Sequence, residues 1–233
     1  MKLRLLVVSL IVASTAVVSS PAAQGAAASA PVVGECHDLT FAELAPMSDS
    51  SAPVDCATTH TALTIQVTTI PDSVWDQGKT KRISYAVRVC QKARYAYFGL
   101  SPKVLERTLF ASSIFFFPDR AQVAAGERFV RCDVVKHSSS KVYPLAADPR
   151  FSKITKDVAA CMSARFKITA CTAPHRFYPT AAVGLPVPRP RSGQETIAVA
   201  RRCVAVTGRR PAAVSWPGGR WTAKSLGVCY RRD

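Results

Sequence analysis

The eight cysteines constrain the fold more than any other feature, because they form two sets of four in matching order. The first set is Cys36, Cys56, Cys90 and Cys132, and the second set is Cys161, Cys171, Cys203 and Cys229. In each set a histidine, His60 or His175, follows the second cysteine by four residues. An aliphatic-Pro pair closes both segments fifteen residues after that cysteine. Such self-similarity indicates two copies of one structural unit.

The first thirty residues have the pattern of a secretory signal peptide. Lys2 and Arg4 precede an apolar run over residues 5–18, and small residues follow it. The apolar run is shorter than the roughly 20 residues that a membrane-spanning helix needs. We therefore expect residues 1–30 to be a cleaved signal peptide, with an uncleaved N-terminal anchor as the alternative. The mature protein would be secreted or lie on the extracytoplasmic face of the cell envelope.

Export changes the interpretation of the cysteines. In an oxidising compartment an even number of cysteines at patterned spacings indicates disulfide bonds, whereas in the cytosol it would suggest a metal site or catalysis. Eight cysteines allow 105 pairings, and the repeat reduces these to three within each copy. We expect all eight to be oxidised, with no metal and no cofactor.

The remaining chain divides into two parts around a polar segment. Residues 31–136 form the first predicted module, residues 137–149 a serine- and proline-containing linker, and residues 150–233 the second module. We refer to the two modules as the first half and the second half. The sequence predicts an α+β fold made of two homologous, small, disulfide-stapled modules of strand–helix–strand type.

Periodicity places the main elements of the first half. Residues 62–69 alternate as a strand does, and residues 81–98 have helical spacing and are followed by Gly99, where a helix would end. A short helix is expected to open at Ser101-Pro102. Residues 113–117 and 128–136 are predicted strands, with a helical turn at residues 121–125 between them.

The second half is predicted as a degenerate copy. Residues 177–185 replace the first strand, although Pro179 suggests a position at the sheet edge. Residues 186–191 are expected to be extended, and residues 195–206 to form the helix that carries Cys203. Residues 152–166 fit either a helix or a strand.

These elements predict the disulfide pairing. Cys36–Cys56 and Cys161–Cys171 would tie the start of each copy to its first strand. Cys90–Cys132 and Cys203–Cys229 would tie the helix to the last strand. An alternative for the first pair is that the first cysteine reaches the strand carrying the fourth.

Positive charge is concentrated in the second half. Residues 31–145 hold 13 basic and 11 acidic groups, a net charge of +2, whereas residues 146–233 hold 16 basic and four acidic groups, a net charge of +12. Outside a cell such a field implies anionic partners, such as lipid headgroups, wall polymers or acidic proteins. The alternative is a soluble, arginine-rich surface without a partner. The anion-binding candidates are Arg201, Arg202, Arg209, Arg210 and Arg220.

The order of motifs resembles the septum-formation domain of actinobacterial cell-envelope proteins. The residues that carry the resemblance are Gly34-Glu35-Cys36, Val54-Asp55-Cys56 with His60, Cys90 on a helix, and Gly126-Glu127-Arg128 with Cys132. The second half repeats the central motif as Cys171-Thr172-Ala173-Pro174-His175 and lacks the Gly-Glu-Arg element. The resemblance implies an envelope location, possible association with septum formation and a module without established enzymatic activity.

His60 and His175 could be over-interpreted as metal ligands or catalytic bases. Both roles need a thiolate beside them, and the neighbouring cysteine is expected to be in a disulfide. We therefore expect structural histidines that contact a backbone carbonyl, with a metal site, catalysis or pH sensing as alternatives. The Ser138-to-Lys141 spacing matches a nucleophile motif of penicillin-binding enzymes, but its partner segments are missing, so we interpret it as chance.

The sequence predicts a non-enzymatic binding or interaction module. Its partner would be an anionic envelope component or an envelope protein, and peripheral membrane contact is compatible with its charge. Nucleic acid is not expected, because the export signal and the sparse aromatic residues argue against it. The alternatives are a secreted hydrolase with an unrecognised site and a basic secreted effector or inhibitor. A deep cleft with convergent polar groups would favour the hydrolase, and a shallow basic face would favour binding.

Overall fold

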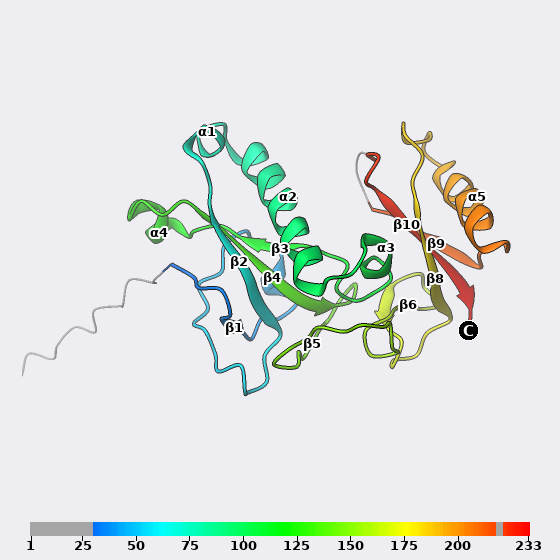
Figure 1. Cartoon of the computed structure of the whole chain (residues 1–233), viewed down its shortest axis with the longest axis horizontal. Helices are drawn as coiled ribbons and strands as arrows, with labels where there is room; N and C mark the ends of the chain where they lie inside the picture. Colours follow the sequence, from blue (N-terminus) through cyan, green and yellow to red (C-terminus); the bar gives the residue numbers. More distant parts are fainter. Residues whose placement is uncertain (1–29, 218–220) are drawn as a thin grey trace, which may run out of the picture.

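The computed structural model describes residues 30–217 and 221–233 and contains two antiparallel sheets, each accompanied by one long helix (Figure 1). This arrangement, with four disulfide bonds, confirms the predicted α+β class. The predicted signal peptide, except for its last residue, and Arg220 lie outside the described residues.

The first sheet has the strand order β1-β2-β4-β3, and β5 lies off that order and pairs with the last two residues of β4. Its strands are β1 (Cys36–His37), β2 (Ala62–Thr69), β3 (Ile114–Phe116), β4 (Phe129–His137) and β5 (Val142–Tyr143). The limits of β2 are those that the alternating pattern predicted. β4 lies in the middle and is buried over most of its length, so it organises the sheet.

The long helix of the first half, α2 (Lys79–Phe98), packs against β2, β3 and β4. Its buried residues are spaced four apart, at Ala86, Cys90, Arg94 and Phe98, and therefore form one stripe on the helix. Gly99 ends the helix with φ 62°, a conformation that glycine adopts at little cost.

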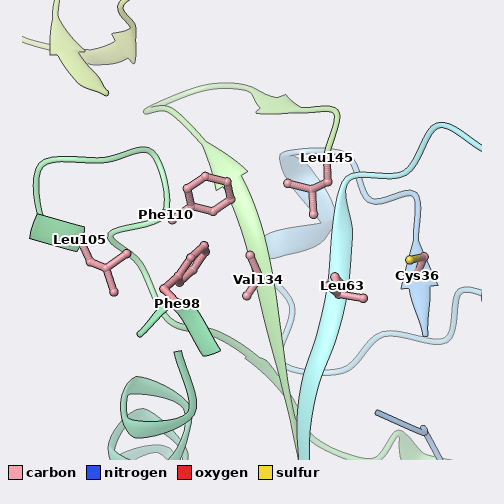
Figure 2. Close-up of a cluster of buried hydrophobic side chains, with 7 residues drawn as sticks. All are labelled: Cys36, Leu63, Phe98, Leu105, Phe110, Val134 and Leu145. Atoms are coloured by element: carbon pink, nitrogen blue, oxygen red, sulfur yellow. The ribbon is translucent and has the colours of Figure 1, made fainter. Parts of the chain in front are cut away.

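The end of α2 contributes to a core that also takes residues from distant parts of the chain (Figure 2). Phe98 packs with Leu105, Phe110, Val134 and Leu145 in this cluster. Leu145 belongs to the predicted linker, and its burial shows that this segment packs on the first half. Residues 137–149 also contain β5, so the segment is more than a spacer.

Four short helices complete the first half. They are a 3-10 helix (Ala42–Leu44), α1 (Asp72–Trp75), α3 (Pro102–Leu105) and α4 (Arg120–Ala124). Asp119 and Gln122 cap the start of α4 reciprocally, through side-chain bonds of 2.8 and 2.9 Å to each other's backbone amides. Ser101 and Pro102 open α3 as predicted, although no side-chain hydrogen bond caps it.

The second sheet has the order β7-β6-β8-β10-β9. Its strands are β6 (Ala160–Met162), β7 (Ile168–Ala170), β8 (Phe177–Gly184), β9 (Ala213–Ser215) and β10 (Leu226–Arg232), and α5 (Glu195–Thr207) packs on it. Residues 152–166, whose sequence fits either a helix or a strand, contain strand β6.

The expectation that Pro179 marks an edge strand was wrong. β8 lies inside the sheet between β6 and β10. Proline is tolerated there because β6 pairs with β8 at Phe177 alone. On the side of β8 that faces β6, position 179 therefore has no strand partner that would need a backbone N–H donor.

All four disulfides join the predicted pairs: Cys36–Cys56, Cys90–Cys132, Cys161–Cys171 and Cys203–Cys229. In each half one bridge ties the strand that opens the half, β1 or β6, to the segment that precedes its long strand, β2 or β8. The other bridge ties the long helix, α2 or α5, to β4 or β10. None of the eight cysteines is free.

The two sheets correspond in more than their disulfides. Strands β6-β8-β10-β9 follow the same order as β1-β2-β4-β3, and β7 is additional. Each sheet also contains a β-bulge, whose extra residue is Ile65 in β2 and Thr180 in β8. Both residues stand nine positions after the second cysteine of their set, Cys56 or Cys171. Division of the chain into two modules remains a prediction, which this correspondence supports.

Backbone hydrogen bonds join the halves beside α3. The amide of Leu109 donates to Val158 at 2.8 Å, and the amide of Ala160 donates to Arg107 at 2.9 Å. Leu109 also packs against Ala160 and Ala170, which places a small apolar cluster across the join.

Candidate functional site

Exposed arginines gather on α5 and on the turn that follows it. Arg201 and Arg202 are adjacent on the helix, and Arg209 and Arg210 follow Gly208, whose φ of 68° ends it. All four are solvent-exposed. Figure 1 shows that α5 lies on the outer side of its sheet, away from the first half. We call these four residues the basic face.

Within residues 30–217 and 221–233, no ion pair neutralises the basic face. Three of the four acidic groups of residues 146–233 have other partners: Asp148 pairs with Arg150 at 2.6 Å, Glu195 with Arg189 at 3.1 Å and Asp233 with His175 at 2.9 Å. The positive field of the four arginines is therefore not cancelled by contacts within the described chain.

The two motif histidines make the same backbone contact. Nδ1 of His60 lies 2.9 Å from the carbonyl oxygen of Thr58, and Nδ1 of His175 lies 2.8 Å from that of Ala173. In each case the carbonyl belongs to the residue two positions earlier, so the ring holds the turn after the disulfide. This contact is the backbone role expected from the sequence. In the part of the chain that the structure describes, no group of three or more metal-ligating side chains forms.

A cleft of about 780 Å³ separates the two sheets. Val87, Gln91 and Arg94 of α2 line one wall, and Trp216 and Leu226 of the second half line the other. Its volume falls within the range of small-molecule sites, which often lie between domains. The sequence did not reveal this cleft, because its lining residues come from segments more than one hundred residues apart.

One ion pair and one histidine stand at the cleft. Arg94 donates to Glu106 at 3.2 Å and to the carbonyl of Phe110 at 3.0 Å. Burial raises the pKa of Glu106, and Arg94 opposes that rise. Burial also lowers the pKa of His137 and raises that of Tyr230 to about 12. His137 and Tyr230 are therefore uncharged at neutral pH.

The cleft has no nucleophile paired with a base among the residues described. Nδ1 of His137 contacts the carbonyl oxygen of Ser138 at 3.0 Å, and its Nε2 has no partner. The Ser138 hydroxyl donates to the carbonyl of Lys141 at 3.2 Å, so the Ser138-to-Lys141 spacing forms a turn. The arrangement can bind a ligand, but it lacks the hydrogen-bonded pair that activates a serine.

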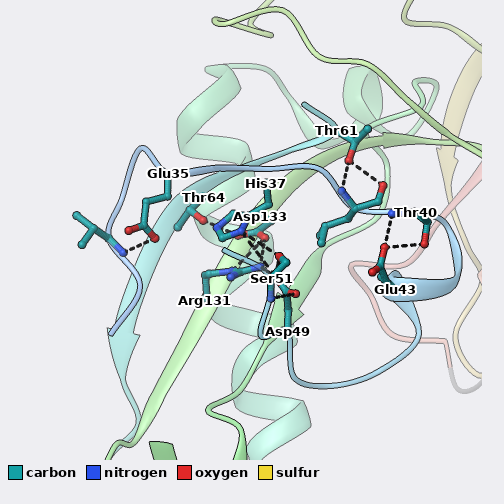
Figure 3. A network of polar contacts seen from close by, with 12 residues as sticks. Glu35, His37, Thr40, Glu43, Asp49, Ser51, Thr61, Thr64, Arg131 and Asp133 are labelled. Atoms are coloured by element: carbon teal, nitrogen blue, oxygen red, sulfur yellow. Dashed lines mark hydrogen bonds and ion pairs between the residues drawn. The ribbon is translucent and has the colours of Figure 1, made fainter. Parts of the chain in front are cut away.

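A second polar cluster is buried on the face of β4 opposite α2 (Figure 3). Arg131 bonds Asp49 at 2.6 Å and Asp133 at 2.9 Å, and the Thr64 hydroxyl donates to Asp133 at 3.0 Å. Burial raises the pKa of Asp133, despite the opposing charge of Arg131. Sequence reasoning missed this network. The local signal was two oppositely charged residues, Arg131 and Asp133, at alternate positions of the otherwise apolar stretch 129–135.

His37 joins this network without forming a catalytic triad. Its Nδ1 lies 3.3 Å from the hydroxyl of Ser51, which itself donates to Asp49 at 2.9 Å. Burial, followed by the charge of Arg131, lowers the pKa of His37. Because the serine proton points to the carboxylate, the histidine does not act as its base. The cluster fixes residues 49–51 against the sheet.

No helix within residues 30–217 and 221–233 combines the length and apolar character needed to cross a bilayer. Comparison of the chain with models of known protein families, with curated proteins and with solved structures found no match. The resemblance to the septum-formation family therefore stays a prediction.

Proposed function

We propose that this protein is an exported, non-enzymatic binding module of the cell envelope, whose basic face holds anionic envelope components. The observation that carries the proposal is the group of four exposed arginines without an ion-pair partner in the described chain. Four disulfides indicate an oxidising, extracytoplasmic compartment and so agree with export. An association with septum formation rests on the resemblance alone.

Electrostatics explains why grouping matters. Exposed charges farther apart than about 8 Å are screened from one another at physiological salt. Adjacent residues such as Arg201 and Arg202, or Arg209 and Arg210, act together on one polyanion. Near an anionic membrane each basic residue contributes about 1 kcal/mol, so four would support reversible attachment.

The test compares two triple charge reversals in the full mature chain. One changes Arg201, Arg202 and Arg210 to Glu, and the control changes Lys153, Lys156 and Arg165, which are exposed elsewhere in the second half. Both alter the net charge equally. We expect the first to weaken binding to anionic vesicles and to soluble polyphosphate by more than about 100-fold, because three favourable charges become repulsive.

The control should bind within about threefold of wild type, because the reversed charges lie outside the basic face. Wild-type binding should also fall steeply between about 50 and about 500 mM salt. Equal losses in both variants, or no wild-type binding at low salt, would contradict the proposal. Equal thermal midpoints would show that neither variant unfolds the protein.

The cleft favours a secreted hydrolase as a second candidate. Glu106, whose pKa is raised by burial, is the group there best suited to donate a proton. A panel of chromogenic ester and glycoside substrates tests this function. Turnover that disappears in Glu106→Gln would establish hydrolysis, and turnover that is equal in wild type and Glu106→Gln would exclude a role for this carboxyl.

A further inference from the structure

The outward side of α5 carries aliphatic residues on the same stripe as an arginine of the basic face. Ile197 is 55% exposed and Val204 is 41% exposed. With Arg201 they occupy positions i, i+4 and i+7, which share one side of a helix. The buried residues of α5, Glu195, Val199 and Cys203, lie on the opposite side, against the sheet.

This combination suits a lipid surface better than a soluble polyanion. A chain of phosphates in water needs only positive charge, and it gains nothing from aliphatic side chains. A helix that lies in a membrane interface needs both, with an apolar side at the boundary of the acyl chains and basic residues at the headgroups. Single exposed aliphatic residues are common, but two beside an arginine without an ion-pair partner in the described chain form a directed surface.

Two of the remaining arginines can reach the headgroups from the end of the helix. Arg209 and Arg210 leave the end of the helix after Gly208, whereas Arg202, at about 100° per residue, points about 140° away from Ile197 and stays outside the stripe. Arginine side chains extend along an apolar surface while their charged ends stay in the polar layer. Ile197 and Val204 can therefore enter the interface without removing these guanidinium groups from water.

We propose that the outward face of α5 docks on an anionic lipid bilayer, with Ile197 and Val204 inserted at the headgroup boundary and with Arg201, Arg209 and Arg210 of the basic face on the lipid phosphates. The inference rests on the proposed function, and it names the bilayer as the anionic component. Charge complementarity selects the bilayer surface, and the aliphatic stripe distinguishes it from soluble or wall-bound polymers.

The experiment uses the full mature protein with vesicles of phosphatidylglycerol and phosphatidylcholine and, separately, with soluble polyphosphate. The variant is Ile197→Ser with Val204→Ser. The matched control is Val206→Ser, because Val206 is 61% exposed on the same helix but points about 180° away from Ile197. The double variant should bind vesicles about tenfold more weakly, since two partly exposed aliphatic residues no longer leave water.

Polyphosphate separates the inference from the proposed function. The double variant should bind polyphosphate as wild type does, and Val206→Ser should match wild type for both ligands. Unchanged vesicle binding by the double variant, or wild-type binding to polyphosphate but not to vesicles, would overturn the inference and leave the proposed function standing. If the wild-type protein bound neither vesicles nor polyphosphate, both the inference and the proposed function would be contradicted.

A folding control keeps the result interpretable. All three substituted positions are exposed, so the thermal midpoints of the variants should stay close to that of wild type. Loss of polyphosphate binding in the double variant would show that serine disturbs the basic face itself, and would also count against the inference.

Discussion

Arg107 of the first half donates a hydrogen bond of 2.6 Å to the carbonyl oxygen of Thr180 in the second half. Thr180 is the extra residue of the bulge in β8, and the extra residue of a bulge is left out of the strand ladder. The side chain thus supplies a partner for a carbonyl that the sheet does not use. The bond holds α3 and the second sheet together beside the cleft.

Replacing this arginine should loosen the join. We expect Arg107→Ala to lower the free energy of unfolding by about 1.5–3 kcal/mol, because a charged hydrogen bond to a partly buried carbonyl is lost. Amide exchange should rise in β8 more than in β2. Arg120→Ala removes an exposed arginine from α4 and serves as the control. Similar stability losses in both variants would contradict the role of the bond.

The disulfides should differ in their contribution to stability. Cys90–Cys132 closes a loop with a sequence separation of 42, against 10 for Cys161–Cys171. Loop entropy gives about 4 kcal/mol for the first and about 2.7 kcal/mol for the second. Denaturant unfolding of the two double Cys→Ser variants measures this order, and the reverse order would refute it. Alkylation of the native protein should label no thiol.

Gly227 should not tolerate a side chain. An added Cβ would lie 2.8 Å from Leu185, 2.9 Å from Val199 and 3.0 Å from the carbonyl oxygen of Ser215. The two side chains could shift, but the backbone oxygen of β9 is fixed by pairing with β10. Gly227→Ala should therefore destabilise the second half by about 1–3 kcal/mol through overpacking. Gly184→Ala, with open space around it, should change thermal stability much less.

The buried histidine at the cleft should make stability depend on pH. Burial lowers the pKa of His137 below its ordinary value of 6.5, so the unfolded chain takes up this proton first as the pH falls. Stability should therefore decrease below about pH 6.5. The same sign applies to His37, whereas the raised pKa values of Glu106 and Asp133 act in the opposite direction at lower pH.

The measurement is the free energy of unfolding of wild type and His137→Gln between about pH 7.5 and about pH 5.5. The difference between the two proteins isolates the contribution of His137 from that of the other groups. Wild type should lose more stability than the variant across this interval. Parallel curves would show that His137 does not titrate differently on folding.

Local patterns predicted the elements that depend on local spacing. The period-two alternation gave β2, and helical spacing with a terminal glycine gave α2, which begins at Lys79 rather than Lys81. The four disulfide pairs followed from placing cysteines on these elements. α5 ends at Thr207, before Gly208, and is therefore one residue longer than the predicted helix over residues 195–206.

Features that depend on distant contacts were not predictable in the same way. β5 and β6 are two and three residues long, too short for a periodic signal, and they exist because β4 and β7, respectively, pair with them. The prediction of an edge strand at Pro179 was wrong, because an inner strand accepts a proline where its neighbour, β6, no longer pairs with it. The cleft and the Arg131 network bring together segments whose proximity no spacing encodes. Grouping of the arginines on α5 was predictable, but the aliphatic stripe beside them was not recognised.

Every disulfide joins two cysteines of the same half, so the two halves are linked covalently through the backbone and not through a disulfide. Lys153 and Lys156 are exposed in the connecting segment between Leu145 and β6. A single proteolytic cut after either lysine would leave two separately cross-linked fragments that part on a non-reducing denaturing gel. In a native buffer the same fragments would stay associated through the Arg107 bond, the contacts around Leu109 and the hydrogen bonds between Ser139 and Ile168.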